Sequence, residues 1–129
     1  MSYPTNLRYT ETHEWARVDG ASVVVGITDF AVHSLQDLVF IDLPKVGAKV
    51  EKGKRFGEIE SVKAVSDLYA PITGAVVERN ERLMQELDLL AKDPFGAGWM
   101  LKIRMEKPSE ANNLLDDAAY QKVIDADNH

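Results

Sequence analysis

The chain has 129 residues, a formal net charge of −6 at pH 7 and no cysteine. This length fits one domain with a single core, and the acidic balance argues against nucleic acid and anionic lipid as partners. Without cysteine there is no disulfide, no thiolate nucleophile and no cysteine-ligated zinc, so any redox role requires an attached group.

The first third of the chain predicts strands around one short helix. Two β-rich runs flank Asp19-Gly20, a dipeptide that tolerates positive φ and favours a hairpin. Thr28 is a suitable N-cap for a short helix that follows it. The run LVFIDLP predicts a strand that stops at Pro44, because proline cannot donate to a ladder.

Two segments of similar design come next, GAKVEKGKRFGEIESV and SDLYAPITGAVVERN. Each combines β-rich runs with a turn that contains glycine, as an approximate duplication would. Lys63 falls in the short polar break between them and is the only cation from Phe56 to Glu78. We therefore expect Lys63 at the tip of a hairpin.

The last third combines helical runs with one strand. The run NERLMQELDLLAK favours helix and ends before Asp93-Pro94, where a loop is expected. WMLKIRM predicts the final strand, and Asp116 can cap a terminal helix on which Ala119, Val123 and Ala126 share one face. Many short strands with little helix indicate a β-sandwich or flattened barrel with a helical addition.

The sequence contains no complete catalytic or metal-binding set. His13, His33 and His129 lack the spacing of a zinc site, and no nucleophile elbow, P-loop or dinucleotide fingerprint occurs. Glu58 and Glu60 alternate onto one strand face, which we interpret as a solvated face because acid–base catalysis needs a pocket and unequal environments. These features favour a carrier or binding protein over an enzyme.

Lys63 has a setting that suits covalent modification. A lone exposed lysine usually serves solubility, but a modifying enzyme needs an amine held away from the protein body on a rigid support. The block ESVKAVSDLYAPITGAVVERN around it resembles the H-protein family of the glycine cleavage system. The resemblance continues almost from end to end through YTETHEW, VGITDFA, DLVFIDLP, VGAKVEKG, DPFGAGWM and LLDDAAY.

This resemblance implies a mainly β, lipoyl-type fold, a barrel-sandwich hybrid of antiparallel strands with short helices and a C-terminal helix. It implies one lipoyl-carrier domain over residues 1–129, not an enzyme, with lipoic acid in amide linkage to Lys63. Glycine decarboxylase (P protein) would load the arm with an aminomethyl group, and aminomethyltransferase (T protein) would pass that group to tetrahydrofolate. Dihydrolipoamide dehydrogenase (L protein) would reoxidise the arm, and lipoate-attaching enzymes would be further partners.

Three carboxylates are candidates for roles beside the arm. Glu14 and Asp67 stand in two matching blocks, and we expect them in a cleft that holds the ammonium of the aminomethyl group by charge-assisted hydrogen bonds. Glu60 is close to Lys63 in the sequence and is a candidate for recognition by lipoate-attaching enzymes. The alternative for Glu14 and Asp67 is that each is an ordinary surface charge. The alternative for Glu60 is that lipoate-attaching enzymes recognise the geometry of the hairpin alone.

Three positions depart from the pattern of the family. Gln36 and Ala91 stand where glycine and asparagine are usual, and Leu87 stands where proline is common. Gln36 falls at an expected helix end, a position that glycine occupies more easily if φ is positive, at a cost of about 1 kcal/mol for another residue. None of the three departures lies in the lysine block.

The same residues leave two other functions open and also predict a location in the cell. A relay carrier that hands lipoyl or octanoyl groups to 2-oxoacid dehydrogenase complexes would use Lys63 in the same way, and a noncatalytic interaction domain would explain the acidic surface. A biotin carrier is disfavoured because Val62 and Ala64, not methionines, flank the lysine. The start at Met1 lacks a basic and apolar leader, which predicts the bacterial cytoplasm.

Overall fold

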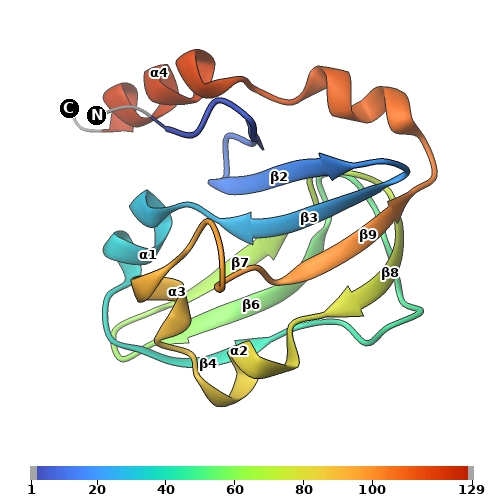
Figure 1. Cartoon of the computed structure of the whole chain (residues 1–129). Coiled ribbons are helices and arrows are strands. Elements are labelled where there is room, and N and C mark those ends of the chain that lie inside the picture. The colour runs from blue at the N-terminus through green and yellow to red at the C-terminus, as the bar shows by residue number, and fades with distance from the viewer. Residues whose placement is uncertain (1–2, 128–129) are drawn as a thin grey trace.

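The computed structural model describes residues 3–127; His129, considered above as a metal ligand, lies outside them. Two antiparallel sheets form the body of the molecule (Figure 1). The larger sheet contains β1 (Arg8–Tyr9), β2 (Glu14–Asp19), β3 (Ser22–Ile27), β9 (Leu101–Met105), β8 (Gly74–Arg79) and β5 (Lys49–Val50), in this order. The smaller sheet contains β4 (Leu38–Asp42), β6 (Arg55–Ser61) and β7 (Val65–Tyr69).

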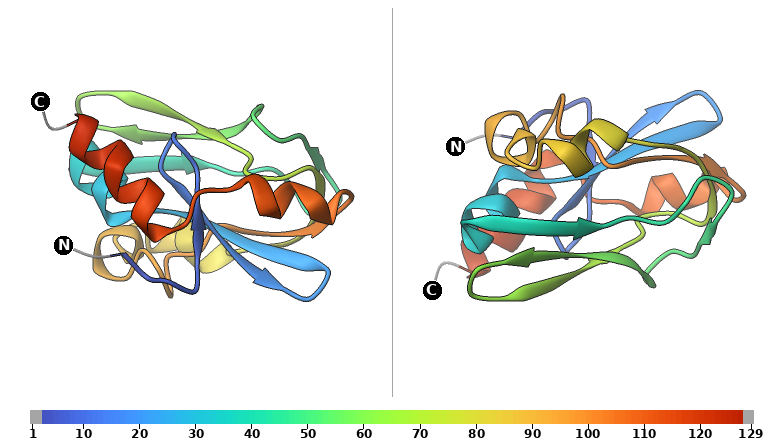
Figure 2. Two further views of the ribbon diagram at one scale, coloured as in Figure 1. Left: turned by 90° about the horizontal axis from the view of Figure 1, so that it is seen from above. Right: turned by 90° about the horizontal axis from the view of Figure 1, so that it is seen from below.

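Short helices lie at the ends and on one side of this sandwich. They are α1 (Asp29–Leu35), α2 (Glu81–Gln85), α3 (Leu89–Lys92), a 3-10 helix η1 (Pro108–Asn113) and the terminal α4 (Asp117–Asp127). The views from above and below show the two sheets as separate layers, with α1 at the end of the molecule that also holds the tip of the β6–β7 hairpin (Figure 2). The predicted mainly β fold with short helices and a C-terminal helix is thus confirmed.

The main core lies between the sheets, where apolar side chains of both inner faces meet. Ile59, Ile72 and Ile103 are among its fully buried members. A second cluster beneath α4 is aromatic, and Tyr9 stacks on Tyr120 with ring centroids 4.7 Å apart. Stacked aromatic pairs add to area burial by about 0.5–1.5 kcal/mol, so this cluster fixes the terminal helix on the sandwich.

Local sequence signals explain the elements around α1. Gly20 has a φ of 64° in the turn between β2 and β3, as the predicted hairpin requires. Thr28 caps α1, because its Oγ1 accepts a hydrogen bond from the Ala31 amide at 3.4 Å. Gln36 ends the helix as expected, and its φ of 51° is the positive value at which glycine would fit more easily.

Two expectations about the other helices need correction. The helix-favouring run from residue 80 to 92 forms two short helices, α2 and α3, with a break between them that was not predicted. Asp116 caps α4 as predicted, accepting from the Ala119 amide at 2.8 Å. The predicted buried face was wrong, because Tyr120 and Ile124 are the buried residues while Ala126 is exposed. The larger side chains turn toward the aromatic cluster, where burial removes more apolar area from water.

Candidate functional site

The tip of the β6–β7 hairpin holds Lys63 away from the body of the protein. β6 and β7 pair up to Glu60 and Val65, and the Ser61 amide donates to the Ala64 carbonyl at 2.8 Å. The Ala64 amide in turn donates to Ser61 Oγ at 3.1 Å. The predicted hairpin tip is therefore confirmed, and it is a closed, hydrogen-bonded turn.

A further hydrogen bond anchors this tip to the segment after α1. The Val62 amide donates to the Asp37 carbonyl at 3.1 Å, so the turn is fixed from outside the hairpin. Lys63 is exposed. Within residues 3–127 its side chain forms no hydrogen bond and no ion pair. The arrangement presents an exposed amine on a hydrogen-bonded turn, which suits attachment of a prosthetic group.

The outer face of the smaller sheet surrounds the lysine with carboxylates and apolar groups. Glu58 and Glu60 both point outward along β6, as their alternation predicts. Arg55 forms ion pairs with Glu58 and with Asp67, the latter at 2.9 Å from Nε to Oδ1. Glu60 has no ion-pair partner in the described part of the chain, so it is the carboxylate on β6 that is free to meet a partner.

Glu14 and Asp67 lie in the walls of one cleft of about 110 Å³, which we call the acidic cleft. Its walls come from the start of β2, the end of β3, α1 and β7, and consist of Thr12, His13, Glu14, Ile27, Ala31, Ser34, Leu35, Ser66, Asp67 and Leu68. The structure thus brings the two predicted carboxylates together. Asp67 is half exposed and paired with Arg55, whereas Glu14 is only 1% exposed. For Glu14, the alternative of an ordinary surface charge is wrong.

Hydrogen bonds orient the Glu14 carboxylate within the acidic cleft. Thr10 Oγ1 donates to Glu14 Oε1 at 2.7 Å, and Thr12 Oγ1 donates to the same oxygen. The Tyr69 amide donates to Glu14 Oε2 at 3.3 Å. Burial raises the pKa of Glu14 to about 7, although these hydrogen bonds favour the charged form. Glu14 therefore changes charge near neutral pH.

Sequence reasoning missed the residues that support the two carboxylates. Thr10 and Thr12 precede Glu14 at spacings of four and two residues, and a hydroxyl so close to a carboxylate is a weak local signal. Arg55 lies opposite Tyr69 in the ladder, and its approach to Asp67 depends on the strand register. Register cannot be read from the residues on either strand alone.

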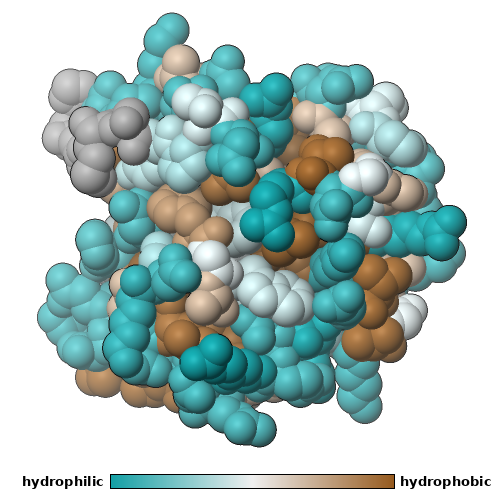
Figure 3. Space-filling model, in the orientation of Figure 1, coloured by the Kyte–Doolittle hydropathy of each residue, from teal (hydrophilic) through white to brown (hydrophobic). Residues whose placement is uncertain are grey.

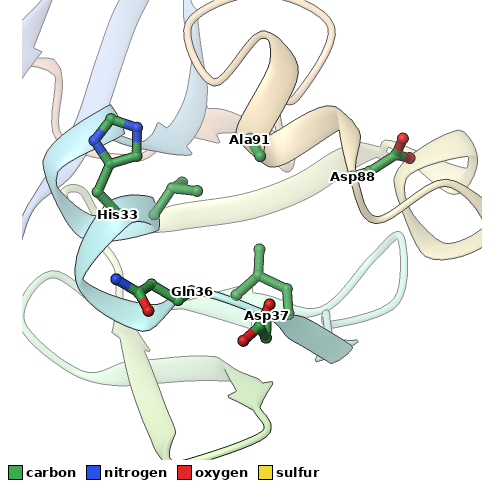
Figure 4. A pocket seen from close by; sticks show the side chains of 7 residues that line it. His33, Gln36, Asp37, Asp88 and Ala91 are labelled. Carbon is green, nitrogen blue, oxygen red and sulfur yellow. The ribbon is translucent and has the colours of Figure 1, made fainter.

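A second cleft of about 320 Å³ lies between α1, the turn after it and α3 (Figure 4). We call it the apolar cleft, for the apolar groups that line it beside the two carboxylates of Asp37 and Asp88. Its lining residues are Val32, His33, Gln36, Asp37, Leu38, Asp88 and Ala91. Two of the three departures from the family pattern, Gln36 and Ala91, thus line the same cleft. No role was predicted for it from the sequence.

Metal sites and membrane-spanning helices were sought among the described residues. No group of three or more histidine, aspartate or glutamate side chains that could hold a metal ion occurs in the described part of the chain. No helix within residues 3–127 is long and apolar enough to cross a membrane. The face seen in Figure 3 is mainly hydrophilic, with separate small apolar areas.

Comparisons with known proteins agree along almost the whole chain. A family model described as "Glycine cleavage H-protein" matches residues 7–127. The chain is 51% identical over 127 residues to a glycine cleavage system H protein of Trichormus variabilis, with 98% of each chain covered. It is 48% identical over 124 residues to that of Bacteroides thetaiotaomicron, covering 96% of this chain and 98% of the relative.

A solved structure gives the same result for the fold. The crystal structure of a glycine cleavage system H protein from Mycobacterium marinum superposes with a TM-score of 0.85 at 40% identity. The match covers 93% of this chain and 97% of the other. Both the sequence and the arrangement of the strands are therefore similar to those of glycine cleavage system H proteins.

Proposed function

Because the chain belongs to the glycine cleavage H-protein family, we propose that Lys63 is the residue through which it carries lipoic acid. Its role is that of the lipoyl-bearing shuttle of the glycine cleavage system. We assign the whole chain, residues 1–129, to one carrier domain. The protein is a substrate of the enzymes of that system and catalyses no step itself.

The exposed amine of Lys63 carries this proposal. It stands at the tip of a hairpin closed by Ser61 and Ala64 and anchored by the bond from Val62 to Asp37. When bound, the lipoyl group supplies a disulfide that accepts an aminomethyl group and electrons. The hydrogen-bonded tip fixes the point of attachment from which the arm swings. A tethered group reaches each docked enzyme at an effective concentration of roughly millimolar or higher.

Three enzymes are the partners in this proposal. Glycine decarboxylase loads the aminomethyl group, aminomethyltransferase removes it, and dihydrolipoamide dehydrogenase takes the electrons. The high effective concentration allows affinities between the proteins to remain modest, so that the partners exchange rapidly. The relatives named above come from the bacteria Trichormus variabilis and Bacteroides thetaiotaomicron. The cytoplasmic location of this protein, expected from its sequence, stays a prediction.

Glu14 and Asp67 hold the ammonium of the aminomethyl group in the acidic cleft. The cleft is supported as a binding site by its two carboxylates and by the burial of Glu14. Asp67 is part of β7, the strand that follows the lysine turn, so an arm attached to Lys63 can be laid back along that strand. Charge-assisted hydrogen bonds would fix the amine and keep water from it.

Glu60 serves recognition by lipoate-attaching enzymes. It is half-buried on β6 opposite Val65 in the ladder, and it carries a charge that no described side chain neutralises. The proposal as a whole is tested by incubating the purified chain with a lipoate-attaching enzyme and then with the three glycine cleavage enzymes. Glycine-dependent release of carbon dioxide is expected from the wild type and none from Lys63→Arg.

A further inference from the structure

The apolar cleft and the acidic cleft lie on opposite sides of α1. Ala31, Ser34 and Leu35 line the acidic cleft, whereas Val32, His33 and Gln36 line the apolar cleft. Successive residues of a helix are about 100° apart, so these two sets of side chains point in nearly opposite directions. One short helix therefore separates two binding spaces.

The apolar cleft adjoins the lysine tip through two of its lining residues. Asp37 lines this cleft, and its carbonyl accepts the hydrogen bond from the Val62 amide at 3.1 Å. Lys63 is the next residue after Val62, and Leu38, also in the lining, pairs with Ser61. An arm attached to Lys63 therefore starts beside one wall of the cleft.

The lining of the apolar cleft suits an uncharged ligand. Val32 is buried, Leu38 is half-buried and the methyl group of Ala91 faces the hollow from α3 (Figure 4). Of the two carboxylates in the lining, Asp37 and Asp88, the latter is paired with Lys92 at 2.8 Å, which reduces the negative charge offered there. The volume of about 320 Å³ exceeds the 110 Å³ of the acidic cleft.

A five-membered ring with two bonded sulfur atoms matches these walls. The ring is apolar, polarizable and without hydrogen-bond donors, so it gains by leaving water for an aliphatic surface. Ile27, Leu35 and Leu68 also give the acidic cleft apolar walls, but that cleft is smaller and contains the buried carboxylate of Glu14, which an uncharged ring cannot pair with. An arm that ends in an ammonium is expected to prefer the acidic cleft, where carboxylates can accept charge-assisted hydrogen bonds from it.

We propose that the apolar cleft binds the disulfide ring of the lipoyl arm when the arm carries no amine. The arm thus has two resting positions, one on each side of α1, and the charge at its end selects between them. The inference rests on the proposed function, because it requires lipoylation of Lys63. It adds a binding site to that function and assigns the residues of the site.

The first test compares amide NMR spectra of the unmodified protein and the oxidised, lipoylated protein. Intact mass is measured first, and an unmodified Lys63 would refute the proposed function together with this inference. With Lys63 modified, signals of Gln36, Asp37 and Ala91 are expected to shift, while those of Thr12 and Ser66 keep their positions. Shifts confined to the hairpin, or centred on the acidic cleft, would overturn this inference and leave the carrier role standing.

The second test blocks the apolar cleft. Ala91→Phe fills it from an exposed position on α3, and Ala126→Phe is the matched control at an exposed position on α4. The rate of reduction of the arm by a water-soluble phosphine is measured for each oxidised, lipoylated protein. A two-fold or larger increase is expected for Ala91→Phe, with no change for Ala126→Phe. Equal rates for the wild type and Ala91→Phe would overturn the proposal.

Discussion

The Tyr69 amide donates a hydrogen bond to Glu14 Oε2 at 3.3 Å, which joins β7 of the smaller sheet to β2 of the larger one. Glu14 is therefore a buried link between the two layers as well as a wall of the acidic cleft. Ionising a carboxyl group in such a place costs free energy, since water no longer surrounds the charge. That cost makes Glu14 the most informative residue for pH-dependent behaviour.

Glu14→Gln should remove a pH dependence of folding stability. Burial raises the pKa of Glu14 from 4.5 to about 7, so between these values the folded state binds more protons than the unfolded state. Stability must then fall as pH rises through this window, by at most roughly 3 kcal/mol. Urea unfolding of the wild type and Glu14→Gln at pH 5 and pH 8 measures the effect.

The variant should match the wild type near pH 5 and exceed its stability at pH 8. His13 and Asp67 line the same cleft, and Tyr120 hydrogen bonds to His13, so the comparison uses the difference between the two proteins rather than the slope of either. Glu60→Gln, on the outer face of β6, is the control. Parallel pH profiles for the wild type and Glu14→Gln would contradict the assignment of this titration to Glu14.

The double variant Glu14→Gln/Asp67→Asn should shorten the life of the loaded arm. Each charge-assisted contact contributes about 1.5–3 kcal/mol when well formed, and the partial exposure of Asp67 reduces its share. We expect the aminomethyl group to be lost about ten times faster from isolated loaded protein. The ratio between variant and wild type should be larger at pH 8 than at pH 6, because Glu14 ionises between them.

Decay of purified loaded protein, kept apart from aminomethyltransferase, is the measurement. Asp42→Asn is the matched control, since Asp42 is an exposed carboxylate on β4 and is absent from the lining of the acidic cleft. Its decay should equal that of the wild type. If the double variant also decays at the rate of the wild type, the two carboxylates do not shelter the cargo.

Gln36→Gly should stabilise the protein. Gln36 has a φ of 51° and a ψ of 163°, a conformation that costs a residue with a side chain about 1–3 kcal/mol. Glycine relieves this strain but adds freedom to the unfolded chain, which offsets about 0.4–1 kcal/mol. The net gain should be about 0.5–1 kcal/mol by urea unfolding. Gln85→Gly in α2, where φ is negative, should destabilise, and a loss of stability in both variants would show that Gln36 is unstrained.

Glu60→Gln should slow lipoylation without changing the melting temperature. Glu60 lies on β6 near Lys63, and no described side chain pairs with it, so its charge is available to an attaching enzyme. Glu58→Gln is the matched control on the same strand face, where the carboxylate is already paired with Arg55. Initial rates of lipoylation in vitro decide the point. Identical rates for Glu60→Gln and the wild type would leave recognition to the geometry of the hairpin alone.

The sequence predicts those parts of the structure that depend on local signals. The turn at Gly20, the cap at Thr28 and the hairpin around Lys63 each follow from residues close together in the chain. The burial of Glu14 does not, because it depends on how β2 meets β7 across the sandwich. The buried face of α4 was missed for a similar reason, since the aromatic cluster beneath it comes from distant segments.

The two clefts also depend on contacts between distant segments, which local sequence signals do not predict. Glu14 and Asp67 were expected together because they stand in two blocks of the family resemblance, and the structure places them in one cleft. The apolar cleft could not be expected, because it forms where α1 and α3 approach each other. Gln36 and Ala91 were noticed only as departures from the pattern, and nothing in the sequence indicates that they face one hollow.

Lipoylation of Lys63 is the central claim, and peptide mass spectrometry tests it most directly. The wild type and Lys63→Arg are produced in cells supplied with lipoate, digested and compared. Each lysine-containing peptide is then examined for the mass of one lipoyl group. The account predicts one lipoyl group per chain, on the peptide that contains Lys63, and none in Lys63→Arg. An unmodified wild type under these conditions, or lipoate on another lysine with glycine cleavage retained in Lys63→Arg, would contradict it.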